Sequence, residues 1–175
     1  MNFIRSQNSG TFHFGYIDDS QYTGSIAYSN IIDFSGEWSV QITGYQIGNN
    51  AFVNQNFNTV IDTGTGGSDL PRSVVDAYFA KIPGSSFNSG YNTYQYPCDQ
   101  QLLDFTFGLP DGGKTTIPAA YLENGSIDGD NCVSQLNVGS DDGSLWGMTF
   151  IEALFVVFDY DGNRVGFANK PSSDA

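Results

Sequence analysis

Asp62 is the residue whose setting in the chain best suits acid-base chemistry. It follows the apolar pair Val60 and Ile61 and opens the run Asp62-Thr63-Gly64-Thr65. A strand end would aim the carboxylate, the glycine would let backbone N–H groups approach its oxygens, and the hydroxyls would orient it. The alternative is an Asx turn, because Asp and Gly are common where a strand enters a turn. Residue types alone leave both interpretations open.

Other site chemistries find little support in the sequence. His13, the only histidine, lies between two phenylalanines, which favours a structural or surface role and argues against a Ser-His-Asp assembly. Two cysteines and one histidine lack the spacing of a zinc site, and Gly64–Gly67 lacks the lysine of a phosphate-binding loop. The calcium-like run Asp159–Asn163 has Lys170 where a glutamate is needed, so a hairpin turn is expected. We expect no metal and no cofactor.

Composition predicts one β-rich domain over residues 1–175. A chain of 175 residues can bury one sizeable core. Val, Ile, Thr, Tyr and Phe recur in short runs broken by Gly, Asn and Asp, which is typical of many short strands. The net charge of −13 with six basic residues argues against nucleic acid as a partner. The acidity fits simple solubility or adaptation to acidic surroundings.

The elements that must position Asp62 are mostly strands separated by turn signals. Strands are expected at Thr11–Ile17, Gly24–Ile31, Trp38–Ile47, Phe57–Asp62, Asp104–Leu109, Lys114–Pro118, Leu154–Phe158 and Arg164–Ala168. A helix is predicted over Pro71–Ile82, because Pro71 suits a first turn and Pro83-Gly84 a stop. A second short helix is possible over Thr149–Leu154.

Three further signals concern the surroundings of the chain. No apolar run is long enough to cross a bilayer, and the start of the chain lacks the pattern of a signal peptide, so we expect no membrane partner. Cys98 and Cys132 are compatible with one disulfide or with two free thiols. Asn124-Gly125-Ser126 is a glycosylation sequon in a turn-rich stretch and agrees with a secreted parent.

Four segments in order carry a resemblance that covers about Gly10 to Ala168. They are Gly10–Asp18 with Tyr22–Ile26, the run at Asp62 followed by Leu70-Pro71, the pair Cys98 and Cys132, and Leu145-Trp146-Gly147 followed by the last strands. Together they resemble the C-terminal lobe of a pepsin-like, fungal-type aspartic protease. The resemblance implies a mainly β fold of antiparallel sheets with one or two short helices. It also implies a secreted or vacuolar parent protein.

The resemblance implies a role for each residue of the Asp62 run. Asp62 would be one of two catalytic aspartates, Thr63 would support the lobe junction, and Gly64 would let the backbone approach. Thr65 would hydrogen-bond the outer carboxylate oxygen. The same resemblance implies that Val60 and Gly66 contact substrate and that Cys98 and Cys132 are bridged.

Two departures from the family pattern lie beside this run. Gly66 stands where Ser or Thr is usual, and Gly67-Ser68-Asp69 replaces mostly apolar positions. After Gly147 the family commonly has Asp, whereas this chain has Met148, and Glu152 stands where a basic residue is frequent. These changes affect substrate contacts and lobe docking rather than the strand core.

We therefore predict the C-terminal lobe of an aspartic endopeptidase that acts at acidic pH, with the N-terminal lobe absent and no activity alone. Its partners would be a peptide or protein substrate and the missing lobe or a second copy. The alternatives are a homodimeric protease with two Asp62 residues and a noncatalytic peptide- or partner-binding module. Separation from a second lobe is expected to expose Val60, Ile61, Leu145 and Trp146.

Overall fold

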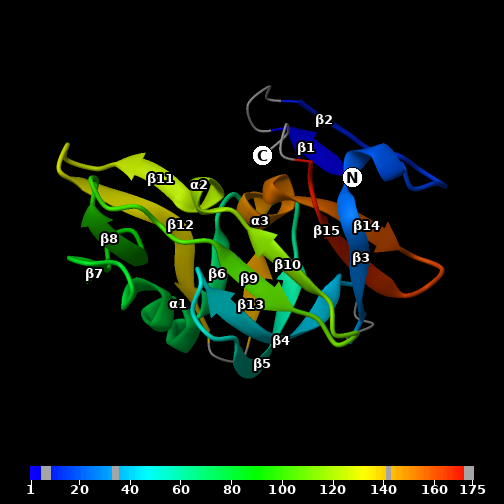
Figure 1. Ribbon diagram of the computed structural model, residues 1–175, viewed down its shortest axis with the longest axis horizontal. Coiled ribbons are helices and arrows are strands. Elements are labelled where there is room, and N and C mark those ends of the chain that lie inside the picture. The colour runs from blue at the N-terminus through cyan, green and yellow to red at the C-terminus, as the bar shows by residue number, and fades with distance from the viewer. Residues whose placement is uncertain (5–8, 33–35, 141–142, 172–175) are drawn as a thin grey trace.

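The largest sheet forms the body of the molecule. The structure is a computed structural model that describes residues 1–4, 9–32, 36–140 and 143–171, and in these residues the largest sheet has ten strands (Figure 1). Its order is β10 (Lys114–Ile117), β9 (Phe105–Gly108), β4 (Ser39–Ile47), β5 (Val53–Ile61), β13 (Ser144–Trp146), β6 (Ser68–Pro71), β12 (Asn131–Gly139), β8 (Thr93–Pro97) and β7 (Ser86–Asn88), with β11 (Glu123–Ser126) paired to β12. The prediction of a mainly β fold is confirmed.

The strand that leads to Asp62 is held on both sides. β5 pairs antiparallel with β4, with Ser39 opposite Val60, and parallel with β13, with Leu145 opposite Val60. β12 and β6 form a second parallel pair. The resemblance implied antiparallel sheets, but the largest sheet contains both antiparallel and parallel pairs. The parallel pairs arise because strands distant in the sequence lie side by side in its centre.

A smaller sheet packs beside the first. Its order is β14 (Leu154–Asp159), β15 (Arg164–Asn169) and β3 (Thr23–Asn30), all antiparallel. The turn from β14 to β15 has Asn163 at φ 48°, and Asp159 accepts hydrogen bonds from the Gly162 N–H and from Arg164 Nε at 2.9 and 2.7 Å. The hairpin turn expected at the calcium-like run is confirmed.

The predicted strand over Thr11–Ile17 is wrong. β1 (Asn2–Ile4) pairs with β2 (Ser9–Thr11), but β2 ends at Thr11 and the chain then bends toward the short 3-10 turn η2 (Asp19–Gln21). Phe12 and Phe14 alternate as they would in a half-buried strand, yet 57% and 86% of their surfaces are exposed. An alternating pattern of apolar residues forms a strand only where a neighbouring strand is available for pairing, and residues 12–17 have none among the described strands.

Helices occupy few of the described residues. α1 (Arg72–Phe79) lies within the predicted Pro71–Ile82 range and buries its apolar residues, and α3 (Met148–Ala153) lies one residue before the predicted second helix. α2 (Ala119–Leu122) was not predicted, because four residues are too few to show a helical period. No helix in the described ranges has the length and apolar character that crossing a bilayer requires.

An aromatic cluster joins α3 to both sheets. The ring of Trp146 lies 4.6 Å from that of Phe107 and 4.7 Å from that of Phe150, and the ring of Phe167 lies 5.5 Å from that of Phe107. Trp146 is fully buried and Ile61 is 4% exposed, whereas Val60 and Leu145 are half-buried. The expected exposure of Ile61 and Trp146 is therefore wrong, because the domain's own core covers both.

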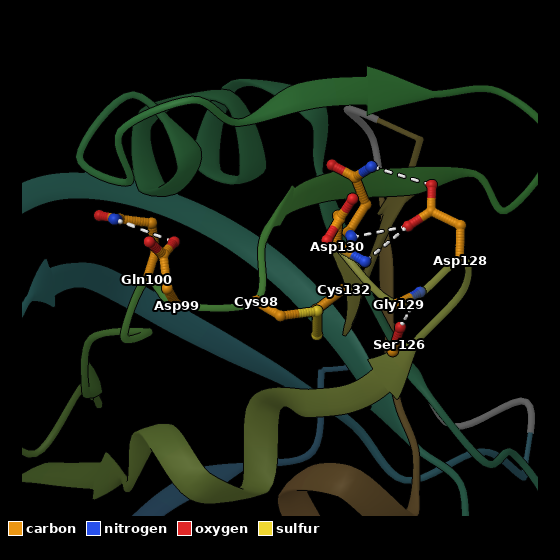
Figure 2. Close-up of a disulfide and its surroundings, with 9 residues drawn as sticks. Cys98, Asp99, Gln100, Ser126, Asp128, Gly129, Asp130 and Cys132 are labelled. Atoms are coloured by element: carbon orange, nitrogen blue, oxygen red, sulfur yellow. Dashed lines mark hydrogen bonds between the residues drawn. A yellow bond between two sulfur atoms is a disulfide. The ribbon is translucent and has the colours of Figure 1, made fainter.

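The disulfide between Cys98 and Cys132 is confirmed. It joins the segment after β8 to β12, with the Cα atoms 5.0 Å apart (Figure 2). The neighbouring loop is held by Asp128, whose carboxylate accepts hydrogen bonds from the backbone N–H groups of Asp130 and Asn131 at 3.1 and 2.7 Å (Figure 2). The Cys98 N–H also donates to the Asp130 carbonyl oxygen at 2.8 Å. The bridge therefore closes a short, well-bonded corner.

Candidate active site

Asp62 stands just beyond the end of β5 and is fixed there through its backbone. Its N–H donates to the Trp146 carbonyl oxygen at 2.9 Å, which continues the parallel ladder between β5 and β13. The Thr65 N–H donates back to the Asp62 carbonyl oxygen at 3.4 Å. The aspartate is thus anchored to the core on one side and begins a turn on the other.

Both carboxylate oxygens of Asp62 are hydrogen-bonded. The Gly64 N–H donates to Oδ1 at 2.8 Å, and the Thr65 hydroxyl donates to Oδ2 at 2.7 Å. Hydrogen bonds from Thr65 and then from Gly64 favour the charged form, so they lower the pKa of Asp62 below its ordinary value. The isolated site is arranged to keep an ionised carboxylate.

No second carboxylate shares this site within the described residues. The carboxylate of Asp62 is bonded to Gly64 and Thr65, and no acidic side chain in the described ranges contributes to the change in its pKa. A single ionised carboxylate can accept a proton or orient a water molecule. It cannot at the same time donate a proton.

The loop after Asp62 is held by the start of α3. The Met148 N–H donates to the Thr65 carbonyl oxygen at 2.7 Å, and Thr149 donates its N–H and its hydroxyl to the Gly66 carbonyl oxygen at 3.2 and 3.1 Å. The contact at Met148 is made by the backbone, so the departure from the family pattern there leaves the loop supported.

Gly147 allows the close approach of the two segments. A Cβ at this position would overlap the backbone carbonyl oxygens of Thr65 and Gly67. Its N–H donates to the hydroxyl of buried Ser68 at 3.2 Å. The support from Gly147 and Thr149 was not predicted from the sequence. The motif around Gly147 was recognised, but its contact with the Asp62 loop depends on tertiary packing.

The remaining predicted site residues lie around Asp62. Thr63 is exposed, and its hydroxyl has no hydrogen-bond partner in the described part of the chain. Val60 is half-buried, and Gly66 is exposed with open space where a Cβ would be. Asn124 lies away from the run in exposed β11, where its Oδ1 accepts a hydrogen bond from Gln135 Nε2 at 2.9 Å. Its glycosylation stays a prediction.

The fold and the site together define a mainly β domain of the acid-protease class. The family model of the eukaryotic aspartyl proteases matches residues 1–170, and the chain belongs to this family. It is 34% identical to penicillopepsin-3 of Penicillium janthinellum over 168 residues, which cover 94% of this chain and 42% of the relative. It is also 34% identical to endothiapepsin of Cryphonectria parasitica over 165 residues, covering 92% of this chain and 39% of the relative.

The match covers less than half of each of these relatives. A third relative, podosporapepsin of Podospora anserina, is 34% identical over 172 residues, which are 96% of this chain and 40% of that protein. The chain thus spans about two fifths of the length of these curated relatives. The predicted resemblance to a pepsin-like aspartic protease is confirmed.

Proposed function

We propose that the chain is the C-terminal lobe of a pepsin-like aspartic endopeptidase and supplies one of two catalytic aspartates. The observation that carries the proposal is the carboxylate of Asp62, held by Gly64 and Thr65 with no second carboxylate beside it in the described residues. Val60 and Gly66 would contact the substrate. A peptide or protein cleaved at acidic pH is the proposed substrate, and the disulfide supports a secreted or vacuolar parent.

The proposed chemistry needs two carboxyl groups in different protonation states. Like charges a few ångströms apart cannot both ionise, so a pair shares one proton. The ionised group takes a proton from the attacking water, while the protonated group donates a hydrogen bond to the scissile carbonyl oxygen. Asp62 alone, with its lowered pKa, supplies the first of these states.

Exposed aromatic side chains are consistent with a second polypeptide that packs against this domain. Phe12, Phe14 and Tyr16, which we call the aromatic patch, are 57%, 86% and 62% exposed. The exposed hydroxyl of Thr63 is free to bond a group outside the described chain. A patch of this kind favours association, and an N-terminal lobe is its proposed occupant.

The test is the peptidase activity of a verified monomer on a denatured protein at about pH 4. We expect no turnover above that of the Asp62→Asn variant. Turnover by the monomer that Asp62→Asn abolishes would contradict the half-site. Activity that instead follows the fraction of dimer in sedimentation would support the homodimeric protease, in which two Asp62 residues meet. Peptide binding without activity in any assembly would support a noncatalytic module.

A further inference from the structure

A pocket of about 290 Å³ opens beside the Asp62 loop. Its lining residues come from four segments: Gly66 and Gly67 from the loop, Tyr121 from α2, Gln135 from β12, and Met148, Thr149 and Glu152 from α3. Because the Thr149 N–H and hydroxyl both bond the Gly66 carbonyl oxygen, the wall of the pocket is rigidly joined to the loop. The pocket and the carboxylate of Asp62 therefore belong to one supported unit.

The two glycines keep this pocket open. The Cβ position of Gly66 has no atom within 4 Å. A Cβ on Gly67 would lie 2.7 Å from Asn137 Nδ2 and 3.6 Å from Gln135 Oε1. Any larger residue at these positions would project into the space or displace its polar lining.

Two polar groups of the pocket are hydrogen-bond acceptors, the Gln135 side-chain oxygen and the Glu152 carboxylate. Gln135 donates its Nε2 to Asn124 Oδ1 at 2.9 Å, which leaves Oε1 on the side of Gly67. Glu152 is half-buried on α3, and its carboxylate forms no ion pair with any described residue. A half-buried carboxylate that shares a pocket with an amide oxygen favours a positively charged donor.

None of the chain's described cations forms an ion pair with the Glu152 carboxylate. Arg72 pairs with Asp76, and Arg164 pairs with Asp159. The ammonium group of Lys170 donates to the backbone carbonyl oxygens of Phe3 and Glu152, not to the Glu152 carboxylate. The Glu152 carboxylate is therefore without a cation from the described residues, and a bound molecule could supply one.

We infer that this pocket binds the lysine or arginine side chain of a substrate peptide and that Glu152 is its specificity-determining residue. The inference rests on the proposed function. Gly66 directly follows Thr65, whose hydroxyl holds the carboxylate of Asp62. An extended peptide rises about 3.3 Å per residue, so a peptide over Asp62 reaches the pocket within a few residues of the bond to be cleaved.

The experiment measures peptide binding by NMR on the isotope-labelled chain at low salt. The probes are alanine- and glycine-based hexapeptides with one central lysine or with the neutral isostere Nε-acetyl-lysine. We expect the lysine peptide to bind about tenfold more tightly, since a hydrogen-bonded charge pair is worth roughly that factor. Shifted amide signals should include Gly66, Gly67 and Glu152 and extend to Gly64.

Matched variants separate the pocket from general attraction to an acidic protein. Glu152→Gln should remove the preference for lysine, whereas Glu37→Gln, with the same change in charge at an exposed site, should keep it. Equal binding of both peptides to the unmodified chain would overturn the inference. So would a preference retained in Glu152→Gln, or shifts that stay on α3 and never reach Gly64, which would indicate a partner rather than a substrate. Binding is read without hydrolysis, so an inactive chain leaves this result independent of the proposed function.

Discussion

The hydroxyl of Thr65 donates to the outer carboxylate oxygen of Asp62 at 2.7 Å, while the Thr65 carbonyl oxygen accepts a hydrogen bond from the Met148 N–H at the same distance. One threonine thus connects the carboxylate to the first turn of α3. The protonation of Asp62 and the packing of the loop are therefore linked through Thr65.

Thr65→Val should raise the pKa of Asp62. Valine keeps the shape of threonine but cannot donate a hydrogen bond, so the largest contribution to the lowered pKa is lost. The carboxyl carbon of Asp62 can be titrated by NMR. The carboxylate of Asp159, whose pKa is lowered by Arg164, is the internal control and should not change. An unaltered pKa of Asp62 in the variant would show that Thr65 does not set it.

The same variant predicts a pH dependence of stability. Because the folded-state pKa of Asp62 lies below the unfolded one, its stabilisation is present above the unfolded pKa, about 3.9, and is lost as pH falls through the folded pKa. Thr65→Val should therefore be less stable than the parent at neutral pH, and the two curves should converge in acid. Urea unfolding at several pH values measures the difference. A gap that is constant down to about pH 2 would exclude the linkage.

Gly147→Ala should destabilise the fold by about 1 to 3 kcal/mol, because the added Cβ overlaps the Thr65 and Gly67 carbonyl oxygens. The matched control is Gly66→Ala, where a Cβ meets open space. Denaturant unfolding of both variants measures the difference in their free energies of unfolding. Equal stability of the two alanine variants would mean that the contact between the closing motif and the Asp62 loop is loose.

Removal of the disulfide should lower the free energy of unfolding by about 4 kcal/mol, because the bridge closes a separation of 34 residues and restricts the unfolded chain. The double variant Cys98→Ser with Cys132→Ser tests this in urea. The parent chain under reducing conditions should match the variant. A loss below about 1 kcal/mol would show that the bridge contributes little beyond the hydrogen bonds of its corner.

Self-association should be weak, promoted by salt, and reduced by Phe14→Ser. The aromatic patch favours contact, whereas the net charge of −13 opposes it until salt screens the repulsion. Lower pH should act in the same direction as salt, because it protonates carboxylates. Sedimentation at several salt concentrations measures the effect, with Val53→Ser, another exposed apolar position, as the control. A dimer of Phe14→Ser as stable as that of the parent would place the contact on another surface.

Local patterns were sufficient for several elements of the fold. The apolar run ending at Asp62, the helix after Pro71 and the hairpin after Asp159 each carry their own signal of period, proline or turn residue. The nine-residue strand β12 was not predicted, because its apolar residues alternate with Asn, Gln and Ser, which are typical of loops. A strand in mid-sheet is stabilised by its neighbours, which the local sequence does not name.

The sequence by itself determined the family of the protein and the short-range chemistry around Asp62, because Gly64 and Thr65 lie within three residues and must meet the carboxylate in any tight turn. Only the tertiary structure decided what supports that turn. The parallel pairing of β5 with β13 brings Gly147 against the loop, and it buries Ile61 and Trp146, for which exposure was predicted. Contacts between segments distant in the chain depend on how whole sheets pack, and the spacing of residues within one segment does not predict that packing.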